Sequence, residues 1–257
     1  MAGRRFDVIL FDLGDTLIYF DGNWPEVFAQ ARQAMLQSLQ SAGLNLGQDF
    51  LDDFYNRMLD YYRQRDAEFV EYTTHYVLRS ALTDWGFASA PDEVLRDALV
   101  GLHNVTQAYW LPEHDALPTL GELRQMGYRL AMISNAADDD NTQVLVDKLG
   151  ARPYLEFVIS SAAHGIRKPN PQIFLTALER MSVAPERAVM VGDTLGADIL
   201  GARNAGIFSI WVTRRADKAA NRAHADTIQP DAQVASLSDL PGLMRRLETD
   251  SAYGLRL

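Results

Sequence analysis

The chain has 257 residues, of which 47% are hydrophobic and 23% charged, a composition typical of a folded globular protein rather than a disordered one. Its formal net charge of -10 argues against broad binding to nucleic acids or anionic membranes, because both are polyanions. It has no cysteine, which excludes disulfides and thiolate chemistry, and no apolar stretch long enough for a membrane span. Asp7 and Asp12 interrupt the apolar run behind the basic start, so a signal peptide fits badly and we expect a cytoplasmic protein.

The first predicted element is a strand at residues 8–11, where Val-Ile-Leu-Phe forms a short continuous apolar run. The run ends at the polar turn Asp12-Leu-Gly-Asp-Thr16. A run of this kind is typical of a strand that is buried on both faces of a parallel sheet.

Residues 24–110 lack such runs and carry four apolar patterns of helical period instead. Gly43, Gly47 and Gly86 separate these patterns, and Pro25 and Pro91 stand where first helical turns should begin. We predict a helical insertion after the first strand, with hinges at its two connections, around residues 18–23 and 111–116.

Four further apolar runs, at 130–133, 157–159, 188–191 and 207–212, predict the remaining strands. Helical patterns closed by Gly127 and Gly150 lie between them, and a third opens with Asn170 as N-cap before Pro171. Strands that alternate with helices imply right-handed crossovers. The sequence therefore predicts an α/β fold with a doubly wound parallel sheet.

Polar residues directly follow several of these strands, and in a parallel sheet the active site forms beyond the carboxyl ends of the strands. The residues in question are Asp12, Ser134 with Asn135, and Asp193 followed by Asp198; Lys168 lies ahead of the helix that Asn170 opens. A carboxylate can attack phosphorus to form an acyl-phosphate, and Mg²⁺ takes one or two carboxylates together with substrate phosphate. A lysine and a hydroxyl can bind the phosphate oxygens. The set therefore predicts phosphoryl transfer.

Four segments resemble the ordered motifs of the haloacid dehalogenase superfamily: 8–17 with Asp12, 132–135 with Ser134, 166–174 with Lys168, and 191–198 with Asp193 and Asp198. The likeness reaches to about residue 245, and the helical insertion resembles the superfamily's helical (C1-type) cap. It implies a Rossmann-like core of residues 1–20 and 113–248, a helical cap of residues 21–112 and a C-terminal tail of residues 249–257.

The resemblance also implies a magnesium-dependent phosphatase that acts on a small phosphorylated metabolite through an aspartyl-phosphate. Asp12 would be the nucleophile, and Ser134 and Lys168 would bind phosphate, with Asn135 beside them. Asp193 would be a Mg²⁺ ligand together with Asp12, Asp198 would support the metal, and the carbonyl of Gly14 would ligate it.

One catalytic position departs from the family's pattern. Phosphatases of this superfamily usually carry a second Asp two residues after the nucleophile, where it protonates the leaving group, and this chain has Gly14 there. Asp15 lies one residue further on, and adjacent side chains normally point differently. General acid catalysis commonly contributes about 10²- to 10⁴-fold, so we expect reduced or selective activity.

The sequence leaves two other functions open. The dehalogenases of the superfamily also lack this acid, although they need no magnesium, and a catalytically weakened metal- or phosphate-binding regulatory protein would keep the metal motif. Asp138, Asp139 and Asp140 are explained by the start of the next helix, which negative charge favours. His75, His103, His114 and His164 show no metal-ligand spacing. The sequence indicates no oligomeric state.

Overall fold

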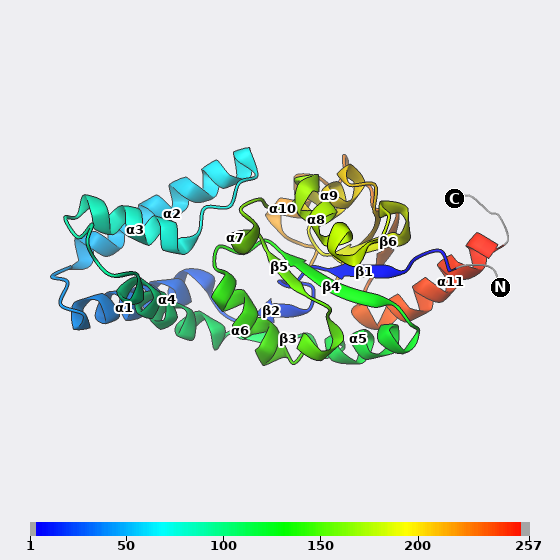
Figure 1. Cartoon of the computed structure of the whole chain (residues 1–257), viewed down its shortest axis with the longest axis horizontal. Coiled ribbons are helices and arrows are strands. Elements are labelled where there is room, and N and C mark those ends of the chain that lie inside the picture. Colours follow the sequence, from blue (N-terminus) through cyan, green and yellow to red (C-terminus); the bar gives the residue numbers. More distant parts are fainter. Residues whose placement is uncertain (1–3, 253–257) are drawn as a thin grey trace.

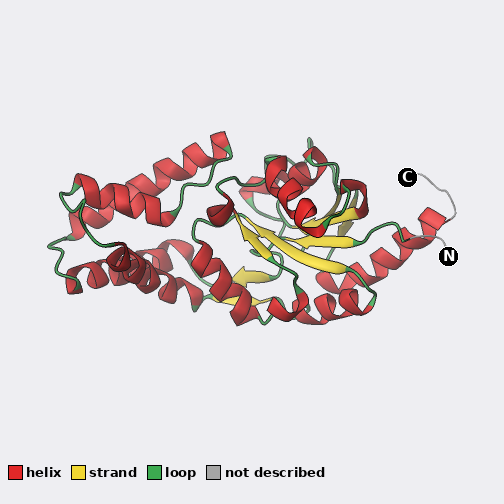
Figure 2. Cartoon of the chain, viewed as in Figure 1, coloured by secondary structure: helices red, strands yellow, loops and turns green. Residues whose placement is uncertain are grey.

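The structure, a computed structural model, describes residues 4–252, and it is built around a six-stranded parallel sheet (Figures 1 and 2). The strand order is β5-β4-β1-β6-β7-β8. The strands are β1 (Val8–Phe11), β4 (Arg129–Ser134), β5 (Val158–Ser160), β6 (Ala188–Gly192), β7 (Phe208–Val212) and β8 (Ala232–Val234). This topology confirms the predicted doubly wound α/β fold.

Strand β1 lies near the middle of the sheet, and this position explains its continuous apolar run. Ile9 and Phe11 belong to the hydrophobic cluster on one face of the sheet, whereas Val8 and Leu10 belong to the cluster on the other. Successive side chains of a strand point to opposite faces, so a strand covered on both sides needs apolar residues at every position.

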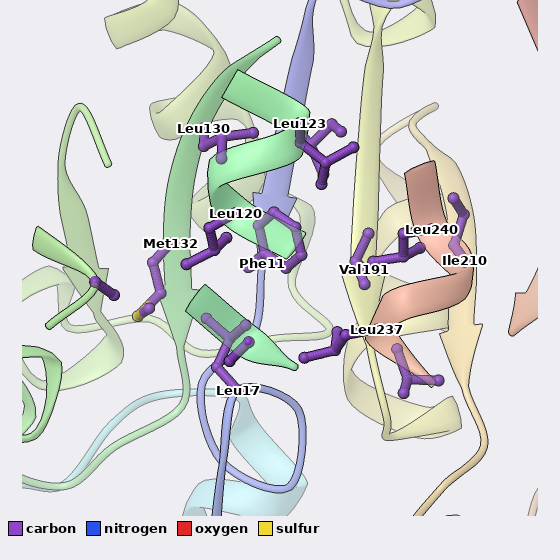
Figure 3. Packing of buried hydrophobic residues seen from close by; sticks show 14 of the residues in the cluster. Phe11, Leu17, Leu120, Leu123, Leu130, Met132, Val191, Ile210, Leu237 and Leu240 are labelled. Atoms are coloured by element: carbon purple, nitrogen blue, oxygen red, sulfur yellow. The ribbon is translucent and has the colours of Figure 1, made fainter. Parts of the chain in front are cut away.

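Helices cover both faces of the sheet. One face packs against α5 (Ala116–Gln125), α6 (Asp139–Leu149) and α11 (Leu240–Ala252), and the other against α8 (Pro171–Met181) and α9 (Leu200–Asn204). Figure 3 shows the first cluster, in which Leu120 and Leu123 of α5 lie with Phe11 and Val191. Asn170 is the N-cap of α8, as predicted, and its side chain accepts a hydrogen bond of 3.0 Å from the Gln172 amide.

The order of the strands brings three separate stretches of sequence to one edge. Strand β1 pairs with β4 on one side and with β6 on the other, with Phe11 in register with both Met132 and Val191. Asp12 and Asp193 directly follow β1 and β6, and Ser134 is the last residue of β4. They are therefore neighbours at the carboxyl end of the sheet, where an open α/β sheet binds its ligands.

The helical insertion forms its own cluster of buried residues away from the sheet (Figure 1). Its helices are α1 (Trp24–Ser41), α2 (Gln48–Glu68), α3 (Thr74–Asp84) and α4 (Asp92–Gln107). Pro25 lies in the first turn of α1, as predicted, but Pro91 is the N-cap of α4 rather than a first-turn residue. The four helical periodicities thus correspond to four helices with a shared core.

The two connections of the insertion are paired strands rather than open hinges. β2 (Ile18–Phe20) and β3 (Trp110–Pro112) form a two-stranded antiparallel sheet, in which Ile18 is in register with Pro112. A second contact joins residues 69–71, beyond α2, to residues 165–167. The Arg167 amide donates to the Phe69 carbonyl at 3.0 Å. The β2–β3 pair and this second contact both tie the insertion to the sheet domain.

Two further features differ from the sequence-based expectation. Strand β8 has the sequence Ala-Gln-Val, so its pattern is too short and too mixed to be distinguished from a loop. Helix α11 continues past residue 249, where a tail was expected, and residues 253–257 of that tail lie outside the described part of the chain. Among the helices that the structure describes, none is long and apolar enough to cross a membrane.

Candidate active site

Asp12 follows β1 and is only 7% exposed. Its amide donates a 2.9 Å hydrogen bond to the Val191 carbonyl, which fixes the backbone where the strand ends. Its Oδ1 accepts a 2.7 Å hydrogen bond from Nζ of Lys168. The predicted nucleophile is thus buried, fixed in position and paired with a cation.

Lys168 lies between two carboxylates. Its Nζ donates to Asp12 and to the Ile133 carbonyl, at 2.7 and 2.8 Å, and forms a 2.7 Å ion pair with Oδ1 of Asp198. Burial opposes the charged ammonium, but the carboxylates of Asp12 and Asp198 outweigh it and raise the pKa of Lys168. Lys168 therefore carries its positive charge inside the protein.

Asp12, Asp193 and Asp198 form a cluster in which one carboxylate oxygen of each residue lies within 4.8 Å of the others. All three side chains are buried. Oδ2 of Asp193 and Oδ1 of Asp198 are each paired with an ammonium group, from Lys218 and Lys168 respectively. Three buried carboxylates that converge in this way are the oxygen ligands that a hard divalent cation takes, so this set fits the metal that the sequence predicts.

Asp198 reaches this cluster because the chain winds tightly after β6. The turn η3 (Leu195–Ile199) is π-helical, and Oδ2 of Asp198 accepts a 2.9 Å hydrogen bond from the Thr194 amide. A Cβ atom at Gly192 would lie 2.4 Å from Cγ of Asp198, a distance that no real contact allows. Glycine is therefore required before Asp193 if Asp198 is to approach this closely.

The three carboxylates repel one another in the metal-free protein. Burial, followed by the charges of Asp12 and Asp198, raises the pKa of Asp193 to about 7, although Lys218 opposes this shift. Burial is also the main cause that raises the pKa of Asp198. The site therefore holds an excess of negative charge that a divalent cation would neutralise.

Lys218 is a residue of this site that sequence reasoning missed. Its Nζ forms an ion pair with Oδ2 of Asp193 and a second one, of 3.3 Å, with Oδ2 of Asp15. It lies beyond β7, in a segment without a motif, so no sequence signal indicated it. Lys218 supplies positive charge beside the predicted metal ligand Asp193.

Two further side chains that the sequence did not indicate hold the backbone of Asp193. Nε1 of Trp211 and Nδ2 of Asn221 donate to the Asp193 carbonyl, at 2.8 and 2.9 Å. Oδ1 of Asn221 also accepts a 2.8 Å hydrogen bond from the Leu195 amide. These hydrogen bonds hold the backbone of Asp193, the predicted metal ligand, in place.

Ser134 ends β4 and Asn135 follows it, and both line the same cavity as Asp12. Ser134 is buried beside the cluster. The side-chain amide of Asn135 binds the backbone of Lys168 at both ends, because Nδ2 donates to the Lys168 carbonyl at 2.9 Å and Oδ1 accepts from its amide at 2.8 Å. Asn135 thus positions Lys168.

Gly14 lines the cavity, whereas Asp15 does not. Asp15 has a φ of 58° and its carboxylate pairs with Lys218. A Cβ atom at Gly14 would lie 3.7 Å from the ring of Trp110, an ordinary contact distance. The turn therefore leaves room for a side chain at position 14 but does not bring Asp15 into its place.

A cavity of about 460 Å³ joins these residues to the helical insertion. Its lining from the sheet domain includes Asp12, Gly14, Ser134, Lys168 and Asp193. Its lining from the insertion includes Trp24, Phe28, Met58, Tyr62, Arg65, Leu102, His103 and Thr106. The insertion thus covers the residues that the sequence predicts to be catalytic, and it adds apolar side chains to the lining of the cavity.

The raised pKa of Asp193 predicts a pH dependence of metal binding. The ordinary pKa of Asp193 is 3.8, and in the folded protein it is about 7. Between these two pH values the folded protein binds more protons than the unfolded chain, so the contribution of Asp193 to the free energy of unfolding falls as the pH rises. A cation must displace the proton. At about pH 6 we therefore expect metal binding to release close to one proton, measured by calorimetry in buffers that differ in protonation enthalpy. A binding enthalpy independent of the buffer would contradict this prediction.

Known proteins with similar sequences are hydrolases. A family model described as haloacid dehalogenase-like hydrolase matches residues 6–206. A glyceraldehyde 3-phosphate phosphatase of Methanopyrus kandleri is 30% identical over 243 residues, covering 94% of this chain and 98% of that protein. The protein of the same name from Methanothermobacter thermautotrophicus is 33% identical over 219 residues, covering 85% of this chain and 90% of that protein.

A solved structure shares the fold. The crystal structure of a 2-haloacid dehalogenase from Pseudomonas syringae pv. Tomato DC3000 matches with a TM-score of 0.67 and 28% identity, covering 94% of this chain and 99% of that chain. Both reactions that the sequence left open, phosphate ester hydrolysis and dehalogenation, thus occur among the similar proteins.

Proposed function

The chain belongs to the haloacid dehalogenase-like hydrolases and is a phosphomonoester hydrolase, and we propose that it works through an aspartyl-phosphate on Asp12. The observation that carries this mechanism is the buried cluster of Asp12, Asp193 and Asp198 with Lys168 between two of its carboxylates. A carboxylate nucleophile beside other carboxylates suits an enzyme in which a cation neutralises the charge.

The first step transfers the phosphoryl group to Asp12. A carboxylate oxygen of Asp12 bonds to phosphorus while the ester P–O bond breaks, and water then attacks the acyl-phosphate and returns the free carboxylate. Lys168 and Ser134 bind the phosphate oxygens, and Asn135 holds the backbone of Lys168 in place. A direct part of Asn135 in phosphate binding stays a prediction.

The enzyme uses a divalent metal, and we propose Mg²⁺. Asp12, Asp193 and the Gly14 carbonyl would hold it, with Asp198 in support. When bound, the ion offsets the charge of the carboxylates and of the phosphate, so that two anions can approach each other.

We propose that residues 21–112 act as a cap over a core of residues 1–20 and 113–248. The cap side of the cavity is lined mainly by apolar residues, and closure of an active site excludes water. The cavity volume of about 460 Å³ fits a small phosphorylated metabolite. Because the similar phosphatases are named for glyceraldehyde 3-phosphate, a triose phosphate is the first substrate to test. The cytoplasmic location and the lack of a nucleic-acid partner stay predictions.

Three measurements separate a phosphatase from a dehalogenase and from a regulatory protein: phosphate release from an aryl phosphate with Mg²⁺, halide release from a 2-haloacid, and Mg²⁺ binding. Phosphate release that the variant D12N lacks supports the proposal. Halide release from a 2-haloacid, without phosphate release, supports a dehalogenase, for which Gly14 is the favouring observation. Neither release, with calorimetric binding of Mg²⁺ intact, supports a regulatory protein.

The variant G14D is expected to gain activity. A side chain at position 14 has room beside Trp110, and the added carboxyl restores a proton donor two residues after Asp12. We expect kcat/KM for an alkyl phosphate to rise by about 10-fold, less than the full effect of a general acid if another group already donates, and for an aryl phosphate much less, because general acid catalysis matters most for a poor leaving group. Steady-state kinetics on both substrates measure this, and an equal change on both would contradict it.

A further inference from the structure

The proposed function needs a proton donor for the leaving group, and Gly14 cannot supply one. We propose that His103 of the cap, paired with Asp138 of the core, donates this proton. His103 and Asp138 both line the cavity that contains Asp12. The proposal rests on the proposed function and assigns a catalytic residue outside the family's four motifs.

The pair joins two elements that are far apart in the sequence. His103 lies on α4, and Asp138 is the N-cap of α6. Nε2 of His103 lies 3.3 Å from Oδ2 of Asp138, and Oδ1 of Asp138 accepts a 2.7 Å hydrogen bond from the Asn141 amide. The side chains of His103 and Asp138 are only 13% and 15% exposed. Asp138 thus lies at the start of a helix, as predicted, and its capping bond occupies only one carboxylate oxygen.

The pairing keeps a carboxylate beside the imidazole. Burial opposes the charge of Asp138, but the hydrogen bond and the positive charge of His103 outweigh it and lower the pKa of Asp138. An ionised carboxylate stabilises an imidazolium, as an Asp partner does in other hydrolytic enzymes. When His103 holds the proton that it donates, its charge offsets that of Asp138, and this aspartate then does not repel a phosphate.

Other charged groups also face the pair from the elements around it. An outer cavity that shares His103 and Asp138 is lined by His75, Asp92, Arg96, Asp97, Asp139 and Asp140. The inner cavity contributes Tyr62, Arg65, Arg167, Lys168 and the carboxylate cluster. The outer groups thus bring four carboxylates and one arginine to the pair, and the inner groups bring two arginines, a lysine and the carboxylate cluster.

The position of His103 depends on the contact between cap and core. Next to the pair, Nε2 of Gln107 on α4 donates a 2.8 Å hydrogen bond to Oδ1 of Asn141 on α6. The imidazole therefore meets Asp138 only when the cap lies against the core. A donor of this kind would be in place when the substrate is enclosed, and it would be withdrawn when the cap opens.

The proton balance closes over one turnover. As the Asp12–phosphorus bond forms and the ester bond breaks, protonated His103 gives its proton to the leaving oxygen and becomes neutral. Water then attacks the acyl-phosphate, Asp12 leaves as a carboxylate, and neutral His103 takes a proton from the water. The second step needs less help, because a carboxylate is a good leaving group.

The variant H103Q, compared with the wild type on two substrates, tests the proposal. We expect kcat/KM for glycerol phosphate to fall by about 10²-fold or more and for p-nitrophenyl phosphate by much less, because nitrophenolate leaves without a proton. The limb of the pH profile that reports a protonated group should also disappear for glycerol phosphate. Adding G14D to H103Q should restore most of the loss.

A matched control separates this role from cap–core packing. Q107A removes the neighbouring hydrogen bond between α4 and α6 but no proton donor, so it should affect both substrates equally. Equal losses in H103Q on both substrates, an unchanged pH profile or no rescue by G14D would overturn the proposal, provided thermal unfolding shows that the variant is folded. If the wild type releases no phosphate from either ester, the proposed function itself has failed.

Discussion

The variant D12N is expected to lose phosphatase activity by about 10⁴-fold or more, which is the scale of removing a covalent nucleophile. An amide in place of the Asp12 carboxylate cannot form the acyl-phosphate. Asp12 is also the carboxylate that Lys168 binds at 2.7 Å, so D12N removes one of that ammonium's two anionic partners. Steady-state kinetics with p-nitrophenyl phosphate, with and without Mg²⁺, measure the loss.

Asp15 offers the control for this experiment, since it belongs to the same turn but pairs with Lys218 and does not line the cavity. The variant D15N should keep most of the wild-type kcat. If D15N fails as completely as D12N, Asp15 takes part in the chemistry after all. If D12N keeps its activity, the proposed covalent mechanism is wrong.

The variant K168M is expected to lose both activity and stability. Lys168 is buried and forms ion pairs of 2.7 Å with both Asp12 and Asp198. Its removal leaves two buried carboxylates without their counter-ion, and breaking a buried pair from one side typically costs about 3–5 kcal/mol. Urea denaturation of the metal-free protein measures the fall in the free energy of unfolding. Mg²⁺ should restore part of it, because a cation bound to the same carboxylates replaces the missing charge.

The matched control is R63M, which removes an exposed ion pair. Arg63 pairs with Asp60 on the surface of α2, where both side chains are more than two-thirds exposed. Exposed pairs contribute about 0–1 kcal/mol, so R63M should leave the unfolding transition almost unchanged. A K168M protein as stable as R63M would show that Lys168 does not hold the carboxylates together.

The sheet was predictable because burial leaves a local signal. Strand β1 lies between two helical layers, and its four apolar residues need no knowledge of the rest of the chain to be recognised. The paired strands β2 and β3 were expected as hinges, since each has only three residues and its partner lies about ninety positions away. Two strands that pair over such a distance carry no hydrophobic periodicity of their own that would reveal the pairing in the sequence.

The site was predictable where a residue ends a strand, as Ser134 does, or directly follows one, as Asp12 and Asp193 do. Lys218, Asn221 and His103 were missed because they come from a loop, a short helix and the cap, and only the folded chain brings them to the cavity. At position 14 the sequence showed that the usual proton donor is missing. It gave no reason to choose His103, which only the folded chain brings to the same cavity.

Acid-quenched mass spectrometry of the peptide that contains Asp12 tests the central claim most directly. The protein is mixed with p-nitrophenyl phosphate and Mg²⁺, quenched during the first turnover and digested. A phosphoryl adduct on Asp12 that forms at the rate of nitrophenolate release, and is absent without Mg²⁺ and from D12N, is the predicted result. Release of nitrophenolate with no adduct, at a rate that D12N does not change, would contradict the account.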